Sequence, residues 1–109
     1  MAKHEFGIMN MFPKQGERYD EYEPQKYDCI SVDDIYIEIL DRQSLDIPVF
    51  YHTLDYPAQG LNYCGVTLIP PQSAAMLAVI IGDNDNLHTL KQLLETAGRD
   101  NNFAIHYGI

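Results

Sequence analysis

The chain contains few of the residues on which metal, nucleic-acid and membrane proteins depend. Its 109 residues include two cysteines, four histidines and only seven lysines and arginines, and tryptophan is absent. The longest apolar run, residues 74–81, is far shorter than the roughly 20 residues that a membrane-spanning helix needs. The first residues also lack the apolar stretch of a secretory signal. We therefore expect a cytoplasmic protein with reduced cysteines and no membrane association.

Sequence motifs for bound groups are equally scarce. The seven glycines form no phosphate-binding series, and the histidines and cysteines show none of the spacings His-x-His, Cys-x-x-Cys or His-Glu-x-x-His. The net charge of −9 and the scatter of the basic residues oppose direct binding to the phosphates of nucleic acid. We therefore expect no cofactor, no metal site and no direct nucleic-acid binding.

Negative charge is abundant, and it is concentrated in residues 17–46. This segment carries ten acidic and three basic side chains, which gives seven of the nine net negative charges, and it holds four of the eight tyrosines. A one-sided field of this kind attracts cationic partners and repels nucleic acid, although it says nothing about the fold.

The order of the predicted elements indicates one α+β domain over residues 1–109, with a mostly antiparallel sheet of about five strands and two to three helices packed on one face. Residues 34–41 fit a helix that begins after Asp33, but their alternating isoleucines also fit a strand, and we favour the helix. Alternating apolar residues predict the strands, which are residues 5–11, 27–32, 49–54, 61–69 and 103–109.

Two further helices are predicted in the second half of the chain. One covers residues 73–81, with Ser73 as its N-terminal cap and Gly82 as its end. It is apolar almost all round, so we expect it deep in the core. The other lies between residues 83–85 and Gly98, with leucines at three- and four-residue steps.

The first and the last predicted strands in the sequence share a short pattern. Residues 6–8 and residues 107–109 both place glycine between an aromatic residue and isoleucine. Glycine in a strand often marks the close approach of another backbone, so the pattern predicts that these strands are neighbours beneath one helix, with chance recurrence as the alternative.

Residues 12–26, which we call the acidic loop, are too polar and too broken by proline and glycine for a buried element. Tyrosine offers rigid contact area, and carboxylates around it can pair with lysine and arginine of a basic partner. The alternative is a solvated loop whose tyrosines cover the rim of the core. The predicted partner-binding residues are Tyr19, Asp20, Glu21, Tyr22 and Glu23, together with Asp33 and Asp34 at the predicted helix start.

A weaker prediction concerns His52 and Cys64. If the hairpin formed by residues 49–69 turns at Ala58, these two side chains lie opposite each other on one face, where an imidazole can activate a thiol. A slip of one residue would separate them, and the sequence offers no oxyanion-hole loop. The alternative is a packed thiol beside a hydrogen-bonded histidine.

These observations favour a non-enzymatic, acidic protein-binding module. In size, charge and expected class the chain is similar in general character to bacterial immunity proteins, which suggests an inhibitor of a basic toxin or nucleic-acid enzyme. The alternative function is a small enzyme or ligand-binding domain with a pocket near His52 and Cys64. A homo-oligomer is a third alternative, and it should use another surface because like charges oppose self-association through the acidic one.

Overall fold

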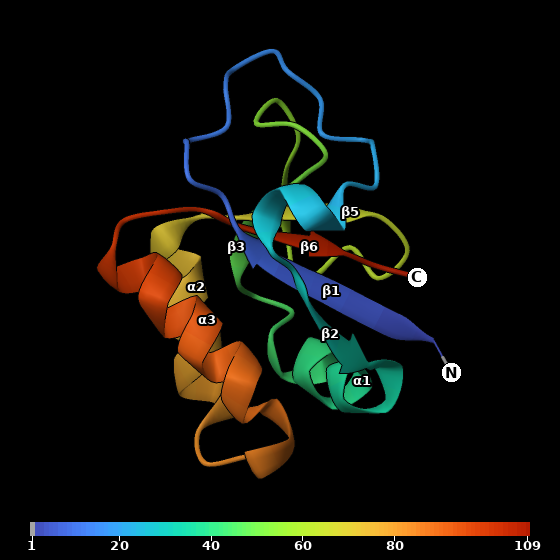
Figure 1. The fold of residues 1–109 in the computed structure, drawn as a ribbon, viewed down its shortest axis with the longest axis vertical. Coiled ribbons are helices and arrows are strands. Elements are labelled where there is room, and N and C mark those ends of the chain that lie inside the picture. Colours follow the sequence, from blue (N-terminus) through green and yellow to red (C-terminus); the bar gives the residue numbers. More distant parts are fainter. Residues whose placement is uncertain (1) are drawn as a thin grey trace.

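The computed structural model describes residues 2–109 and contains one six-stranded antiparallel sheet with three α-helices (Figure 1). The strand order is β2-β1-β6-β5-β3-β4. The α+β class is confirmed, with one strand more than expected. The strands are β1 (Lys3–Ile8), β2 (Ile30–Asp33), β3 (Pro48–Tyr51), β4 (Pro57–Gln59), β5 (Val66–Ile69) and β6 (Ala104–Tyr107). The helices are α1 (Asp34–Gln43), α2 (Pro71–Ile81) and α3 (His88–Arg99), with short 3-10 helices η1 (Pro24–Tyr27) and η2 (Asp85–Leu87).

The three helices cover one face of the sheet, as the sequence predicts. Alternate strand residues, among them Phe6, Val32 and Ile69, join the buried faces of the helices in one apolar cluster. Leu77 of α2 and Leu94 of α3 are almost fully buried in it. No helix within residues 2–109 is both long and apolar enough to cross a membrane.

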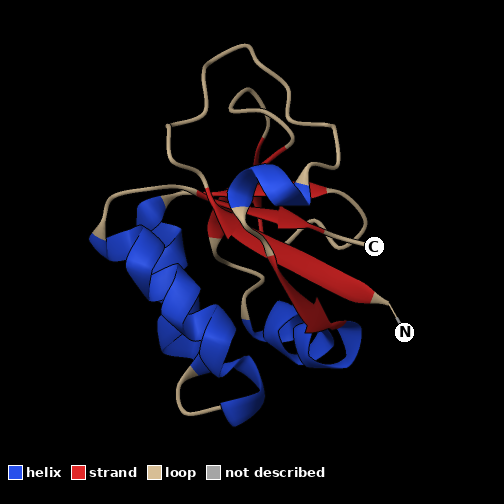
Figure 2. Cartoon of the chain, in the orientation of Figure 1, coloured by secondary structure: helices blue, strands red, loops and turns tan. Residues whose placement is uncertain are grey.

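The opposite face of the sheet is covered by loops and by the short helix η1, and not by an α-helix. A second apolar cluster there joins residues of β5 and β6, including Leu68 and Ile105, to Tyr19 and Tyr27. Every residue of β5 and β6 is consequently buried. Figure 2 shows the covering chain as a long loop segment between β1 and η1, which also extends beyond the end of the sheet. The acidic loop therefore belongs to the folded structure and does more than connect two strands.

The pairing of the two terminal strands is confirmed. β6 lies directly beside β1, with Phe6 opposite His106 and Gly7 opposite Ile105. A Cβ atom at Gly7 would lie 2.7 Å from the Cβ of Tyr27, and one at Gly108 would overlap the backbone of Tyr63. The two glycines thus mark close approach of other segments, residues 27–29 at Gly7 and residues 62–63 at Gly108, and not of the two strands to each other.

The helices differ from the prediction in detail. Residues 34–41 form part of a helix, which settles the ambiguity with a strand. Ser73 does not cap α2, because the helix begins two residues earlier at Pro71 and the serine hydroxyl donates to the carbonyl of Pro48. α2 also does not lie wholly in the core, since Val79 is 80% exposed.

Gly98 does not end the last helix, which runs on to Arg99. Instead, it lets α3 approach α2 closely, because a Cβ atom at this position would lie 3.2 Å from the carbonyl oxygen of Pro71. The left-handed backbone that follows the helix is at Asn101, with φ of 57°.

The predicted hairpin register was wrong. β3 pairs with β5 so that Phe50 lies opposite Leu68, and the His52 amide donates to the carbonyl of Val66 over 3.1 Å. Cys64 therefore lies two residues beyond the position expected for it. The difference arises because residues 57–59 form β4, which folds back against β3 as an additional edge strand.

Candidate partner-binding site

The acidic loop is fixed to the sheet by its tyrosines. Tyr19 and Tyr27 are half-buried against the second apolar cluster. The amide of Tyr19 donates to the carbonyl of His52 over 2.7 Å. Its hydroxyl accepts from the amide of Lys14 over 3.0 Å and donates to the carboxylate of Glu17 over 3.1 Å. Burial is the main reason that the pKa of Tyr19 is raised. The loop therefore holds a defined shape at its centre.

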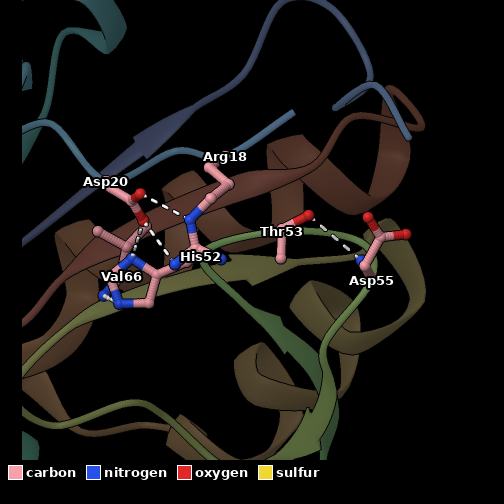
Figure 3. Close-up of polar contacts among 6 residues, drawn as sticks. All are labelled: Arg18, Asp20, His52, Thr53, Asp55 and Val66. Atoms are coloured by element: carbon pink, nitrogen blue, oxygen red, sulfur yellow. Dashed lines mark hydrogen bonds and ion pairs between the residues drawn. The ribbon is translucent and has the colours of Figure 1, made fainter. Parts of the chain in front are cut away.

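A second attachment joins Asp20 to Arg18 and His52 (Figure 3). Arg18 donates to both carboxylate oxygens, over 2.8 and 3.2 Å, and the Nδ1 atom of His52 lies 2.8 Å from Oδ1. Nδ1 is buried and has no hydrogen bond of good geometry, and its contact with the carboxylate becomes an ion pair when the imidazole is protonated. Hydrogen bonding from Arg18, with a smaller contribution from His52, lowers the pKa of Asp20.

His52 itself has an unusual backbone. Its φ of 62° lies in the left-handed region, which is costly for a residue with a side chain. Its Nε2 atom lies 3.4 Å from the amide nitrogen of Val66, and a Cβ atom at Gly65 would come within 2.8 Å of Nε2. Glycine at position 65 therefore makes room for the imidazole beneath the acidic loop.

Beneath the acidic loop lie two adjoining hollows of about 280 and 250 Å³. The larger is bordered by apolar side chains that include Met9 and Phe12. The smaller is bordered by four carboxylates and three tyrosines, with Arg18 and Lys26 as its two cations. These carboxylates and tyrosines are Glu17, Asp20, Glu21, Glu23, Tyr19, Tyr27 and Tyr107. An arginine or lysine side chain would find charge, hydrogen-bond acceptors and aromatic rings in this hollow.

Most carboxylates of this region carry no ion pair. Within residues 2–109, the ion pairs of the acidic loop involve only Asp20 among its acidic residues. Glu21, Glu23 and Asp28 are exposed, and Tyr22 is 64% exposed with its hydroxyl donating to Glu5. The negative charge thus faces solvent, on a segment that Tyr19 and Tyr27 anchor to the sheet.

The seven predicted partner-binding residues fall in two places. Tyr19 to Glu23 lie together on the acidic loop, whereas Asp33 and Asp34 lie at the far end of β2, where α1 begins (Figure 1). Asp33 is 3.9 Å from the ammonium group of Lys3. Asp34 accepts hydrogen bonds from inside the fold, which directs its carboxylate away from a partner.

Those bonds to Asp34 are one end of a buried polar chain that sequence reasoning missed. Nε2 of His4 lies 2.9 Å from Oδ1 of Asp34, and Nδ1 of His4 lies 2.9 Å from Nε2 of His106. Nδ1 of His106 lies 3.0 Å from the hydroxyl of Thr67, which accepts from the amide of Asn62 over 2.8 Å. His4, Thr67 and His106 are fully buried.

One assignment of protons satisfies this chain throughout. Asp34 can only accept, so His4 carries its proton on Nε2 and accepts at Nδ1 from His106. His106 then accepts at Nδ1 from the Thr67 hydroxyl. His106 is neutral in this assignment, and burial is the main reason that its pKa is lowered to about 3. This row of buried hydrogen bonds connects β1, β6 and β5 and has a structural role.

The members of this chain are far apart in the sequence, at positions 4, 34, 67 and 106, so no spacing motif identifies them. The nearest signal was the predicted pairing of the terminal strands, but the predicted first strand began at Glu5 and left His4 just outside it, whereas β1 begins at Lys3. Tyr63 completes the site at Asp34, and its hydrogen bond to that carboxylate raises the pKa of Tyr63 to about 12.

His52 and Cys64 border one shallow hollow of about 200 Å³, although they do not face each other across the hairpin. Asp20 and Tyr22 of the acidic loop also border it. Cys64 is exposed. Within residues 2–109, no group of three histidine, cysteine, aspartate or glutamate side chains is arranged to hold a metal ion.

Comparison of the chain with protein-family models, with curated proteins and with solved structures finds no match in any of the three. The functional argument therefore starts from the geometry of these sites.

Proposed function

We propose that the protein is a non-enzymatic binding module that presents its acidic loop to a basic protein and inhibits it, with a toxin or a nucleic-acid enzyme as the expected class of partner. One observation carries the proposal. The smaller hollow beneath the loop combines four carboxylates with three tyrosines, and three of those carboxylates, Glu17, Glu21 and Glu23, are exposed without an ion pair in the described chain.

The attachment of the loop supports this function energetically. A loop that is ordered before binding loses less conformational entropy when a partner arrives. Tyr19 and Asp20 supply that order through the backbone and side chain of His52. The charges then increase the rate of encounter with a basic surface and oppose acidic partners, including nucleic acid. An inhibitor of an enzyme that binds phosphates would use the same complementarity.

The proposal places the protein in the cytoplasm, where its cysteines stay reduced. Burial, followed by the charges of Glu5 and Asp28, raises the pKa of Cys29 to about 11, which favours an unreactive thiol.

The experiment compares two triple variants that remove the same number of charges. In the loop variant, Glu17, Glu21 and Glu23 are replaced by glutamine. The control variant replaces three exposed acidic residues on or beside the helices, with the substitutions E38Q, D83N and E95Q. The probe is a fluorescent peptide of about ten residues that alternates arginine and serine, and its affinity is measured by anisotropy.

We expect the loop variant to bind the peptide at least about tenfold more weakly and the control variant to stay within about twofold of the parent protein. Raising the salt concentration from about 50 to about 300 mM should weaken binding by the parent protein. Equal loss in both variants, or indifference to salt, would show that the acidic loop is not the binding site. Inhibition is then measured as loss of activity in a panel of basic nucleases at equimolar protein.

The second candidate function is a small enzyme or ligand-binding domain that uses His52 and Cys64. The shared hollow favours it, because Asp20 lies beside His52 as an orienting carboxylate would lie beside a general base. The chemistry would require a Cys64 thiolate at neutral pH.

A further inference from the structure

The two edges of the sheet differ in their protection against added strands. β4 forms one edge, has three residues and begins with Pro57, and proline at an edge discourages further pairing. β2 forms the other edge, and its four residues, Ile30 to Asp33, contain no proline. The open edge of the sheet is therefore at β2.

The register of β2 shows which backbone groups face outward. The amide of Asp34 donates to the carbonyl of Ala2 over 3.0 Å, and Lys3 lies opposite Asp33. Because hydrogen-bonded and non-hydrogen-bonded pairs alternate in an antiparallel ladder, the backbone groups of Ser31 and Asp33 point away from β1. Asp33 is the N-cap residue of α1, so its carbonyl is already used in the first turn of that helix. Three outward groups are left for another strand, which are the amide and carbonyl of Ser31 and the amide of Asp33.

A hollow lies on each side of this edge. On the helix side, a hollow of about 340 Å³ is bordered by β2, by Tyr36 of α1 and by Thr89 and Leu90 of α3. On the loop side, a hollow of about 440 Å³ is bordered by Glu5, which lies opposite Ser31, by Tyr22 of the acidic loop, and by Asp28 and Cys29 just before β2. Side chains alternate between the two faces of a strand, so a strand added to β2 would send them alternately into these hollows.

The chemistry of the hollows defines the added segment. The loop-side hollow contains the carboxylates of Glu5 and Asp28 and no basic residue at its border, so it suits lysine or arginine. The helix-side hollow is bordered by apolar side chains such as Val32 and Tyr36 and by polar ones that include Lys3 and Asp33, so it suits a small uncharged side chain such as valine. The pattern that fits both hollows is an extended segment with alternating basic and apolar residues.

We propose that such a segment of the basic partner binds as an additional strand along β2. This inference rests on the proposed function for the choice of a basic protein as the occupant. It adds a binding mode that depends on main-chain hydrogen bonds as well as on charge. It also gives Tyr22, at the loop-side hollow, and Asp33, at the helix-side hollow, a common role at the border of one binding surface.

The test uses a capped peptide of about eight residues that alternates lysine and valine, added to the isotope-labelled protein. Amide shifts and hydrogen exchange are followed by NMR. We expect the amides of Ser31 and Asp33 to shift and to exchange more slowly. A peptide that is N-methylated on the residues facing β2 should bind at least about tenfold more weakly, because it cannot pair its backbone. A peptide with glutamate in place of lysine should not bind.

Variants of the protein provide a second measurement. Ser31→Pro removes one outward amide at an edge where proline is tolerated, and Ser31→Ala keeps that amide. Binding should be lost in the first variant and kept in the second. If Ser31→Pro does not fold, the N-methylated peptide decides the question without any change to the protein.

The outcomes separate this inference from the proposed function. Shifts confined to residues 17–28, unaffected by N-methylation, would overturn strand addition and leave the acidic loop as the binding site. Shifts at β2 that persist in the loop variant with Glu17, Glu21 and Glu23 replaced would support strand addition and overturn the role of the loop. An absence of shifts at both places would overturn strand addition together with the charge complementarity on which it rests.

Discussion

The two faces of the sheet are covered in different ways. On one face, three helices bury aliphatic side chains and the pair His4 and His106. On the other face, loops cover the sheet with half-buried tyrosines, and the histidine there, His52, pairs with a carboxylate near the surface. The first arrangement buries its histidines in hydrogen bonds, whereas the second displays negative charge outward. The comparison indicates that stability comes mainly from the helix face, and it supports the proposal that a partner binds at the loop face.

The largest effect should come from a cavity on the helix face. Leu94 is fully buried, so Leu94→Ala should lower the free energy of unfolding by roughly 3 kcal/mol, as measured by urea denaturation. Tyr27→Ala on the loop face should lower it by about half as much, because that ring is only half-buried. Hydrogen exchange in the tyrosine variant should increase mainly within residues 10–29. Equal losses, both global, would show that the two faces contribute alike.

An intermediate effect should appear as the pH is lowered. The pKa of His106 falls from 6.5 to about 3 on folding, so between these values the unfolded chain binds more protons than the folded protein. The stabilising effect of the neutral imidazole is present above pH 6.5 and is lost as the pH falls toward 3. Hydrogen bonds from Tyr63 and His4 lower the pKa of Asp34. Its carboxylate therefore also stabilises the fold at neutral pH, and this stabilisation is lost as the pH falls.

The measurement is urea denaturation at several pH values in that range. We expect the parent protein to lose a few kcal/mol, which is the scale of a pKa change of this size. His106→Asn keeps a donor and an acceptor but does not titrate, so it should flatten the profile. His88→Asn changes an exposed histidine and should leave the profile unchanged. A steep profile that persists in His106→Asn would show that the buried chain is not its source.

The smallest effect concerns the thiol on the loop face. If the protein is a binding module, Cys64 should react with iodoacetamide as an ordinary exposed thiol, and Asp20→Asn should change the rate by less than about twofold. Cys29, which is half-buried, serves as the internal slow reference. A fast reaction at neutral pH that depends on Asp20 would instead favour the enzyme hypothesis, because it would reveal a thiolate stabilised by His52.

The helix face could be predicted from the sequence because its residues repeat at regular intervals. Leu87, Leu90 and Leu94 mark the last helix, and Phe6 and Ile8 alternate in the first strand. The cap at Ser73 was wrong because Pro70 and Pro71 already provide the backbone geometry for a helix start, which leaves the serine hydroxyl available to Pro48.

The candidate site could be predicted only in part. The composition of residues 17–23 revealed an acidic surface with tyrosines, but no pattern shows that Tyr19 and Asp20 fasten the loop to His52. These contacts join residues more than thirty positions apart and depend on the left-handed backbone of His52. The register of the hairpin failed for a similar reason, since nothing in residues 57–59 distinguishes a turn from the short strand they form.

The pairing of β1 with β6 has a consequence for the order in which the protein folds. During synthesis, β1 leaves the ribosome roughly a hundred residues before β6, its neighbour at the middle of the sheet. Until then β1 can pair only with β2, and an isolated two-stranded ribbon is marginally stable in water. Strand β5, which both layers cover in the finished protein, meanwhile lacks β6 beside it. The nascent chain therefore carries exposed, unpaired strands until β6 emerges, and contacts this distant make folding slow. Access to chaperones should influence the yield of folded protein more than the stability of the finished fold does.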